Sequence, residues 1–183
     1  MKSGTRHHGL RIRSATEGDF SDIARIYDWH VRHGTASFEI DPPDAGEMLA
    51  RWQALRAHGL PWLIAETADA ITGYACASPW RSRSAYRLTV ENSVYVRHGY
   101  DRQGTGLVLM EALIRQCASL GYRQMIAVIG GSANRASIDF HERLGFHRVG
   151  VLESVGHKFE HWVDTVLMQR ALGEGDTSPP GDA

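Results

Sequence analysis

The sequence predicts a single α/β (α+β) domain, built as one mixed central β-sheet with helices on both faces. The first indication is that strand-type and helix-type patterns alternate along the chain in the order β-α-α-β-β-β-α-β-α-β-β. The second is the apolar run at residues 125–129, which is typical of a strand buried on both faces. The third is length, since 183 residues suit one domain with a substantial core.

The first half of the chain supplies a strand, two helices and a hairpin. We expect the strand at residues 10–13, helices from Phe20 and at 44–58, and hairpin strands at 61–66 and 70–77. Apolar side chains recur every three or four residues in both helices, which places them on one helix face. Turn-forming residues separate the two hairpin strands.

The second half supplies the remaining strands and helices. We expect strands at 87–96, 125–129, 146–152 and 162–168, and helices at 105–120 and 134–144. Gly121 and Gly145 follow the two helices directly, where a glycine commonly ends a helix.

Composition excludes several classes of partner and location. The net charge of −1 gives no electrostatic basis for binding nucleic acid or membranes. No apolar run approaches the length of a membrane span, and the N-terminus lacks the apolar stretch of a signal peptide, so we expect a cytoplasmic protein. Residues 1–9 are expected to form a flexible lead, 10–170 the folded domain and 171–183 a disordered tail.

The cysteines and histidines do not suggest a metal site. Cys76 and Cys117 have neither metal-type nor redox-type spacing, so we expect both to be reduced and packed in the core. The pairs His7 with His8 and His30 with His33 match no zinc pattern. We therefore expect no metal.

The loop before residue 105 is predicted to bind a phosphorylated ligand. It connects a strand to the N-terminus of a helix, where unpaired N–H groups converge and the helix dipole favours an anion. Gly104 and Gly106 carry no Cβ, which lets the backbone approach a bulky phosphate ester.

Several short motifs in the same order carry a family resemblance. Residues 101–106 (DRQGTG) match the loop pattern Q/R-x-x-G-x-G/A, with Asp101 departing at the first position. The further matches are residues 35–39 (TASFE), 83–86 (RSAY), 91–96 (ENSVYV), 127–129 (AVI), 141–146 (HERLGF) and 156–158 (GHK), with Trp162 and Asp164. The chain thereby resembles the GNAT family of N-acetyltransferases, and within it the phosphinothricin and methionine sulfoximine acetyltransferases.

The resemblance implies acetyl-CoA as co-substrate and assigns residues to it. The main chain of Val94, Tyr95 and Val96 would pair with the pantetheine arm, and Asn134 and Ser137 would lie beside that arm. The pyrophosphate would be held by the loop and the first helical turn, namely Arg102, Gln103, Gly104, Thr105, Gly106 and Leu107.

Two residues are candidates for proton transfer. Glu91 is a carboxylate inside a strand, which suits either a general base for the amine or a solvated or ion-paired side chain. His141 stands where the resembled subfamily has a histidine that would protonate the departing CoA thiolate, and its alternative is an exposed helical histidine.

The acceptor site is expected to bind a small amine that carries an acidic group. Arg81 and Arg83, with Lys158 as a further candidate, would hold that group, and Phe38 is either a pocket wall or core. The predicted function is acetyl transfer from acetyl-CoA to a small amino-acid-like acceptor by direct attack, in a chain that the resemblance implies is a homodimer. The alternatives are an acetyltransferase for protein N-termini, a polyamine or an aminoglycoside, and an acetyl-CoA sensor without chemistry.

Overall fold

A computed structural model describes residues 9–179. Within that part of the chain the sheet has seven strands, in the spatial order β1-β2-β3-β4-β5-β7-β6. The strands are β1 (Arg11–Ser14), β2 (Trp62–Glu66), β3 (Ile71–Pro79), β4 (Thr89–Val96), β5 (Gln124–Gly130), β6 (His147–Lys158) and β7 (His161–Ala171). The helices are α1 (Phe20–His33), α2 (Ala45–Ala57), α3 (Thr105–Ser119) and α4 (Arg135–Arg143), with short 3₁₀ turns at Glu17–Asp19 and Ser84–Tyr86.

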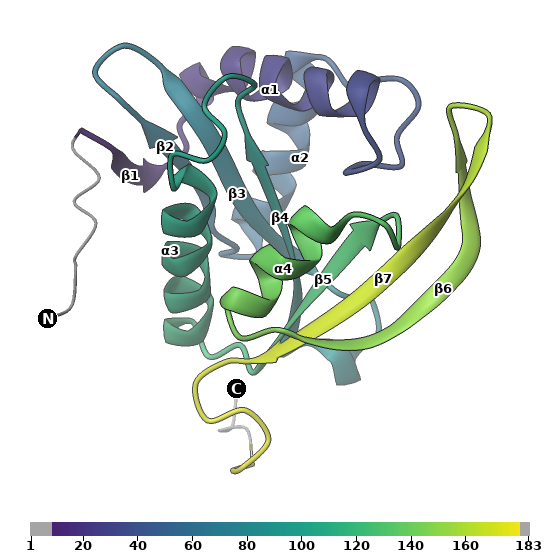
Figure 1. The fold of residues 1–183 in the computed structure, drawn as a ribbon. Helices are drawn as coiled ribbons and strands as arrows, with labels where there is room; N and C mark the ends of the chain where they lie inside the picture. Colours follow the sequence, from purple (N-terminus) through teal and green to yellow (C-terminus); the bar gives the residue numbers. More distant parts are fainter. Residues whose placement is uncertain (1–8, 180–183) are drawn as a thin grey trace, which may run out of the picture.

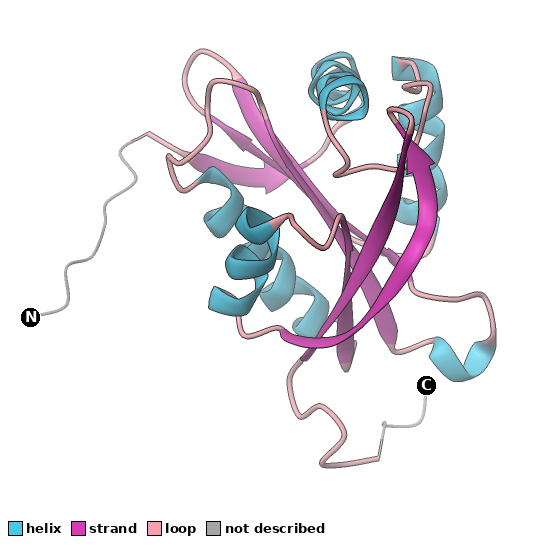
Figure 2. Cartoon of the chain, turned by 45° about the vertical axis from the view of Figure 1, so that its right-hand side comes forward, coloured by secondary structure: helices cyan, strands magenta, loops and turns pink. Residues whose placement is uncertain are grey.

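The fold class and the order of elements predicted from the sequence are confirmed. All neighbouring strands pair antiparallel except β4 and β5, which are parallel, so the sheet is mixed. Helices α1 and α2 cover one face of the sheet and α3 and α4 cover the other (Figures 1 and 2).

Each face of the sheet has its own core. On the α1–α2 face, aromatic and aliphatic side chains such as Phe20, Trp52 and Tyr74 pack together. On the α3–α4 face, Leu109, Met125 and further aliphatic residues form a second cluster. Both cysteines are free and buried, one in each cluster, as expected.

The strands β4 and β5 separate partway along their length. Their parallel pairing runs from Thr89 with Gln124 to Asn92 with Ala127 and goes no further, although β4 continues to Val96 and β5 to Gly130. The sheet therefore divides at its centre, where β4 and β5 diverge (Figure 1).

The C-terminal hairpin is longer than the sequence predicted. Strand β6 does not end at residue 152: it passes through a bulge between Leu152 and Gly156 and pairs with β7 up to Lys158. Residues 153–158 include a glycine and several polar side chains and therefore lack the alternating apolar pattern of a strand. Their strand conformation depends on pairing with β7, which the local sequence does not reveal.

Both ends of the chain extend beyond the paired strands. Residues 1–8 of the expected lead and 180–183 of the expected tail lie outside the described residues. Arg123 donates hydrogen bonds to Gly175, Ser178 and Pro179, which brings this part of the C-terminal segment against the end of the sheet. Across residues 9–179, none of the helices has both the length and the apolar character that crossing a membrane requires.

Candidate functional site

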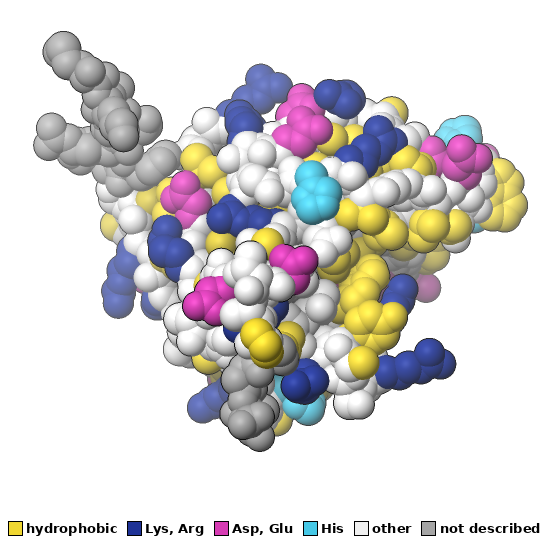
Figure 3. All heavy atoms as spheres, turned by 90° about the horizontal axis from the view of Figure 1, so that it is seen from below, with side chains coloured by type: hydrophobic (Ala, Val, Ile, Leu, Met, Phe, Trp, Pro, Cys, Tyr) yellow, Lys and Arg dark blue, Asp and Glu magenta, His cyan; other side chains and the backbone are white. Residues whose placement is uncertain are grey.

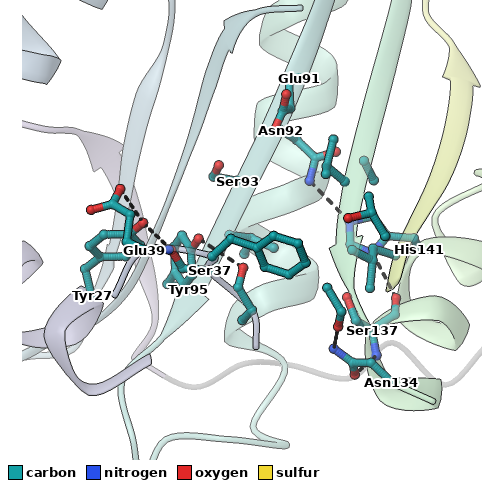
Figure 4. Close-up of a pocket in the computed structure, with 18 residues that line it drawn as sticks. Tyr27, Ser37, Glu39, Glu91, Asn92, Ser93, Tyr95, Asn134, Ser137 and His141 are labelled. Carbon is teal, nitrogen blue, oxygen red and sulfur yellow. Dashed lines mark hydrogen bonds between the residues drawn. The ribbon is translucent and has the colours of Figure 1, made fainter. Parts of the chain in front are cut away.

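A cleft of about 600 Å³ opens where β4 and β5 diverge. It is bounded by both strands, by the loop between α1 and α2, and by the first turns of α4 (Figure 4). Its lining residues are Tyr27, Ala36, Ser37, Phe38, Glu39, Glu91, Asn92, Ser93, Val94, Tyr95, Ala127, Val128, Ile129, Gly130, Asn134, Ser137, His141 and Thr165.

The register of β4 decides which of its main-chain groups face the cleft. The N–H of Arg97 donates to the carbonyl of Thr72 at 2.8 Å, and that of Trp80 donates to Thr89 at 3.2 Å. Hydrogen-bonded pairs alternate along an antiparallel ladder, so the odd-numbered residues of β4 bond to β3 and the even-numbered ones face β5. Beyond Asn92 there is no β5 pairing, so the N–H and C=O of Val94 face the cleft.

The neighbours of Val94 on β4 have their main-chain groups engaged elsewhere. The carbonyl of Val96 accepts a hydrogen bond from Nε2 of His30 at 2.8 Å, and burial lowers the pKa of that histidine. Tyr95 is an odd-numbered position, so its main chain is directed to β3 rather than to the cleft. Of the three residues that the resemblance assigned to the pantetheine arm, Val94 is therefore the one with both main-chain groups available.

Consecutive residues of β4 place polar side chains on opposite faces of the sheet. Glu91, Ser93 and Tyr95 lie on the α1–α2 face, as the alternation predicted, whereas Asn92 lies on the face of α4 and points toward His141 (Figure 4). Since the sheet is divided here, both faces open into the same cleft.

The environment of Glu91 suits a general base. Burial raises the pKa of its carboxyl group above the ordinary value, and the positive charge of Arg81 offsets part of that rise. A carboxylate with a raised pKa binds a proton more strongly, which is the property needed to take one from an ammonium group.

His141 is buried and has both ring nitrogens in hydrogen bonds. Its Nδ1 lies 2.8 Å from the carbonyl oxygen of Ser137, and its Nε2 lies 3.2 Å from Nδ2 of Asn92. The ring is 4 % exposed, and burial lowers its pKa. The histidine is thus not the exposed helical residue that the sequence left open as an alternative.

Asn134 and Ser137 shape the start of α4. The side-chain oxygen of Asn134 accepts from the N–H of Ser137 at 3.2 Å, so Asn134 is the N-cap of this helix. Both residues also line the cleft, which leaves their predicted contact with a cofactor arm compatible with capping.

The predicted phosphate loop has the expected geometry at the start of α3. Gly104 is the N-cap and adopts the left-handed conformation with φ of 84°. The first intrahelical bond runs from Val108 to Gly104, so the amides of Thr105, Gly106 and Leu107 precede it and have no acceptor within the helix. Arg102 also has a positive φ, of 59°. The exposed side chain of Asp101 leaves this main-chain cradle intact.

The loop between α1 and α2 packs against the ends of β5 and β6 and is held there by hydrogen bonds. Lys158 is buried and donates from Nζ to the carbonyl oxygens of Gly34 and Ser37, at 2.9 and 2.7 Å. A Cβ built on Gly130 would lie 1.9 Å from the carbonyl oxygen of Thr35, so this loop requires a glycine beneath it. Lys158 therefore holds the loop and does not line the cleft.

A polar network fixes the same loop to the helices. The hydroxyl of Tyr27 lies 2.7 Å from Oγ of Ser37 and donates to Glu39 at 2.9 Å. Arg51 of α2 pairs with Glu39 at 2.7 Å. Phe38 lies between these anchors and lines the cleft as a pocket wall.

The predicted acceptor-binding arginines lie outside the cleft wall. Arg81 is exposed and stacks on the ring of Trp80 at 4.4 Å, close enough for its charge to lower the pKa of Glu91. Arg83 is exposed and precedes the Ser84–Tyr86 turn. Of the two, Arg81 is the one that acts electrostatically on the cleft.

Sequence reasoning missed several residues of the cleft. Asn92 had a signal, because it is a polar side chain in register with the apolar residues Val90 and Val94. Tyr27 and Ser37 had none, since their meeting depends on the path of the loop. Within residues 9–179, no group of three or more His, Cys, Asp or Glu side chains is arranged to hold a metal.

Comparison with known proteins gives consistent matches. The model of the acetyltransferase (GNAT) family matches residues 23–146. The chain is 48 % identical to phosphinothricin N-acetyltransferase of Alcaligenes faecalis over 169 residues, covering 92 % of this chain and 86 % of that protein.

Two further similarities extend over nearly the whole chain. It is 38 % identical to an L-methionine sulfoximine/L-methionine sulfone acetyltransferase of Pseudomonas paraeruginosa, over 92 % of this chain and 98 % of that protein. A crystal structure of a GNAT superfamily phosphinothricin acetyltransferase from Sinorhizobium meliloti in complex with AcCoA superposes with a TM-score of 0.92 at 39 % identity. It covers 96 % of this chain and 95 % of that one.

Proposed function

The chain belongs to the acetyltransferase (GNAT) family, and from this premise we propose that it transfers the acetyl group of acetyl-CoA to the amine of a small amino-acid-like acceptor. The observation that carries the proposal is the divergence of β4 from β5 beyond Asn92. It frees the main chain of Val94 for an extended ligand and places Glu91 and His141 around the same cleft. Residues 10–170 are the proposed catalytic domain.

The proposed binding of acetyl-CoA follows the cleft from the sheet to α3. The pantetheine arm lies along β4 at Val94, beside Asn134 and Ser137, and the pyrophosphate meets the free amides at the start of α3. Arg102, Gln103 and Gly104 belong to the loop that leads into this helix, and its first residues, Thr105, Gly106 and Leu107, supply the amides. No metal takes part in this proposal.

The proposed reaction is direct attack. Glu91 takes one proton from the acceptor ammonium, and the free amine attacks the thioester carbonyl to form a tetrahedral intermediate. The N–H of Val94 donates to the oxyanion. The C–S bond then breaks. The nitrogen gives its second proton to solvent, and the CoA thiolate takes one from the imidazolium form of His141. Glu91 then returns its proton to solvent and His141 takes one up, so that one proton is released per turnover.

The proposed acceptor carries an acidic group besides its amine. Phosphinothricin and methionine sulfoximine are named for relatives of this chain and have this character. Arg81, whose charge already acts on Glu91, is the favoured partner of the acidic group, with Arg83 as the second candidate. Phe38 forms the wall of the acceptor side, and Lys158 contributes by holding the loop that carries Phe38.

The test is release of CoA, followed with a thiol reagent in the presence of acetyl-CoA and a panel of amines. The panel contains phosphinothricin, methionine sulfoximine, methionine sulfone, common amino acids, spermidine, an aminoglycoside and a peptide with a free N-terminus. We expect release with the acidic amino-acid analogues. Release with the peptide or the polycations alone would overturn the acceptor class, and acetyl-CoA binding without release would support a sensor.

We also propose that the chain forms a homodimer through β6 and β7. Large apolar side chains are exposed on this hairpin, including Val155, Phe159 and Trp162, the last of them 70 % exposed. Hydrophobic atoms gather on the right-hand side of Figure 3, the side on which the hairpin lies in Figure 1. Sedimentation should report a dimer for the natural chain and a monomer for Trp162→Glu. The cytoplasmic location expected from the sequence stays a prediction.

A further inference from the structure

Asn92 is a buried residue for which the reaction above has no use. Its side chain is 7 % exposed, lines the cleft and lies on the α4 face of the sheet. The Nδ2 atom is bonded to His141, whereas Oδ1 has no hydrogen-bond partner among the residues that the structure describes. A buried acceptor without a partner is costly and calls for an explanation.

The tautomer of His141 follows from its two contacts. A neutral imidazole has one N–H and one acceptor nitrogen. The carbonyl of Ser137 can only accept, so the proton is on Nδ1, 2.8 Å from that oxygen. Nε2 is then the acceptor, and this is the reason that Asn92 presents its NH₂ group rather than its oxygen.

Protonation of His141 would invert the second contact. An imidazolium carries N–H groups on both nitrogens, and two donors cannot face each other across a hydrogen bond. The carboxamide of Asn92 would have to rotate so that Oδ1 accepts from Nε2, and its NH₂ group would then face the cleft. The amide thus shows an acceptor to the cleft when the histidine is neutral and a donor when it is charged.

We propose that Asn92 is a positioning residue that couples the protonation of His141 to the polarity of the cleft wall. In the neutral state its free Oδ1 accepts an N–H of a bound substrate, either the acceptor amine or an amide of the CoA arm. In the charged state Oδ1 holds the Nε2–H of His141 and the NH₂ group faces the thiolate that leaves. The Nε2 proton is released from Oδ1 to that thiolate. The inference rests on the proposed function only for the catalytic role of His141.

Asn92 is the side chain that is hydrogen-bonded to Nε2 of His141, so the orientation of its amide follows the charge of the ring. Two aromatic rings pack edge-on against His141 with centroids at 5.1 Å, those of Phe140 on the same helix and Phe146 beyond its C-terminus. The carbonyl of Ser137 favours the charged form and burial disfavours it. Of the acidic side chains that line the same cleft, Glu91 lies on the opposite face of the sheet, and Glu39 belongs to the loop between α1 and α2 and is paired with Arg51.

The direct test needs no substrate. Nitrogen-15 NMR of the whole chain should show protonated Nδ1 and unprotonated Nε2 in neutral His141. The side-chain amide signals of Asn92 should shift with the same pH midpoint as His141. The inference would be overturned by a neutral His141 that is protonated on Nε2, or by Asn92 amide signals that do not shift at the pH midpoint of His141. If His141→Ala left acetyl transfer intact, the proposed role of His141 would fail while the NMR result stood.

Substitution of Asn92 distinguishes coupling to the protonation of His141 from a role in packing alone. In Asn92→Asp a carboxylate can accept from Nε2 but cannot donate to it, so the imidazolium is favoured. We expect the His141 midpoint to rise by at least one pH unit, the kcat profile to move with it, and kcat to fall about tenfold to hundredfold. Gln53→Glu, the same change of group on the exposed side of α2, should alter none of these values. An unmoved midpoint in Asn92→Asp would overturn the coupling.

A second variant tests the free oxygen. Asn92→Leu removes both polar atoms, keeps the number and branching of the side-chain heavy atoms, and should fold even if the buried carboxylate does not. Loss of one neutral hydrogen bond corresponds to about fivefold in affinity. A rise of that size in the Kd for acetyl-CoA identifies the CoA arm as the donor, and a rise in KM for the acceptor alone identifies the amine. Unchanged values for both would overturn the acceptor role of Oδ1.

Discussion

The ring of Phe38 occupies the space in which a side chain on Gly156 would have to lie. A Cβ built on this glycine would approach the ring to 2.4 Å. The loop between α1 and α2 and the bulged part of β6 are therefore fitted to each other, and that fit positions the wall of the cleft.

Gly156→Ala should therefore displace Phe38 and impair acceptor binding. The ring is 39 % exposed and has room to move, so we expect a loss of about 1 kcal/mol in the free energy of unfolding, the low end for overpacking. The KM for the acceptor should rise severalfold, while the Kd for acetyl-CoA stays constant. The control is Gly150→Ala in the same strand, where an added Cβ meets no atom within 4 Å. Equal KM values for the two variants would contradict the role of this contact.

Gly104→Ala should weaken acetyl-CoA binding beyond its effect on folding. The position has φ of 84°, and an alanine there costs about 1 kcal/mol in the free energy of unfolding. It also precedes the amides proposed to hold the pyrophosphate, and losing one such bond to a charged group corresponds to roughly tenfold or more in Kd. Calorimetric titration with acetyl-CoA measures this change.

The loop provides a matched control in Gly99→Ala. Gly99 has φ of 87° and open space around its Cβ position, so the substitution carries the same conformational cost away from the helix N-terminus. The two variants should unfold at similar temperatures, yet only Gly104→Ala should lose affinity. A similar loss of affinity in both would place the effect in loop strain rather than in the cradle.

The sequence was most informative where function depends on local pattern. The strand-loop-helix around Gly104 and the alternation that places Glu91 on one face were both predictable, because they arise within one element or across one turn. The role of Lys158 was not, since it depends on β6 passing a bulge and meeting a loop 121 residues earlier in the chain. Its burial against two carbonyl oxygens is set by tertiary packing alone.

The pairing of Asn92 with His141 shows the same limit more sharply. The amide stands among apolar neighbours of β4, which marks it as unusual, but its partner comes from a helix 49 positions later. The packing of α4 against the divided sheet brings the two side chains within hydrogen-bonding distance. A local pattern can indicate that such a residue needs a partner, and the fold decides which one it has.

Asp19→Asn should destabilise the fold in a manner that depends on pH. Two hydrogen bonds from the guanidinium of Arg13, each of 2.8 Å, lower the pKa of Asp19 from 3.8 to about 2. A group with a lowered pKa contributes stability above its unfolded value and loses it as pH falls through the folded value. The substitution should cost roughly 2 kcal/mol near neutral pH. Urea unfolding at several pH values between 7 and 2 measures the difference.

That difference should shrink as pH falls from about 4 toward 2, because the natural carboxyl group is then also neutral. Asp69→Asn, in the exposed turn between β2 and β3, is the matched control and should have little effect at any pH. A deficit for Asp19→Asn that stayed constant down to pH 2 would point to lost packing instead of the ion pair.

Glu91→Gln should lower kcat by about 10²- to 10⁴-fold with little change in the Kd for acetyl-CoA, since a general base contributes on this scale. Burial raises the pKa of Glu91, so the active carboxylate form is lost at a higher pH than for an ordinary glutamate. The natural enzyme should therefore show a kcat that rises through this raised pKa, and the variant should lack that limb. The measurement is a pH profile of kcat with a saturating acceptor.

The melting temperature of Glu91→Gln distinguishes loss of the general base from loss of folded structure. A carboxyl group whose pKa is raised on folding costs stability above its unfolded pKa, so Gln should leave the melting temperature at neutral pH unchanged or higher. Glu111→Gln, on the exposed side of α3, should retain both the rate and the pH profile. If Glu91→Gln kept the acid limb of the profile, that limb would belong to another group, and Glu91 would not be the base.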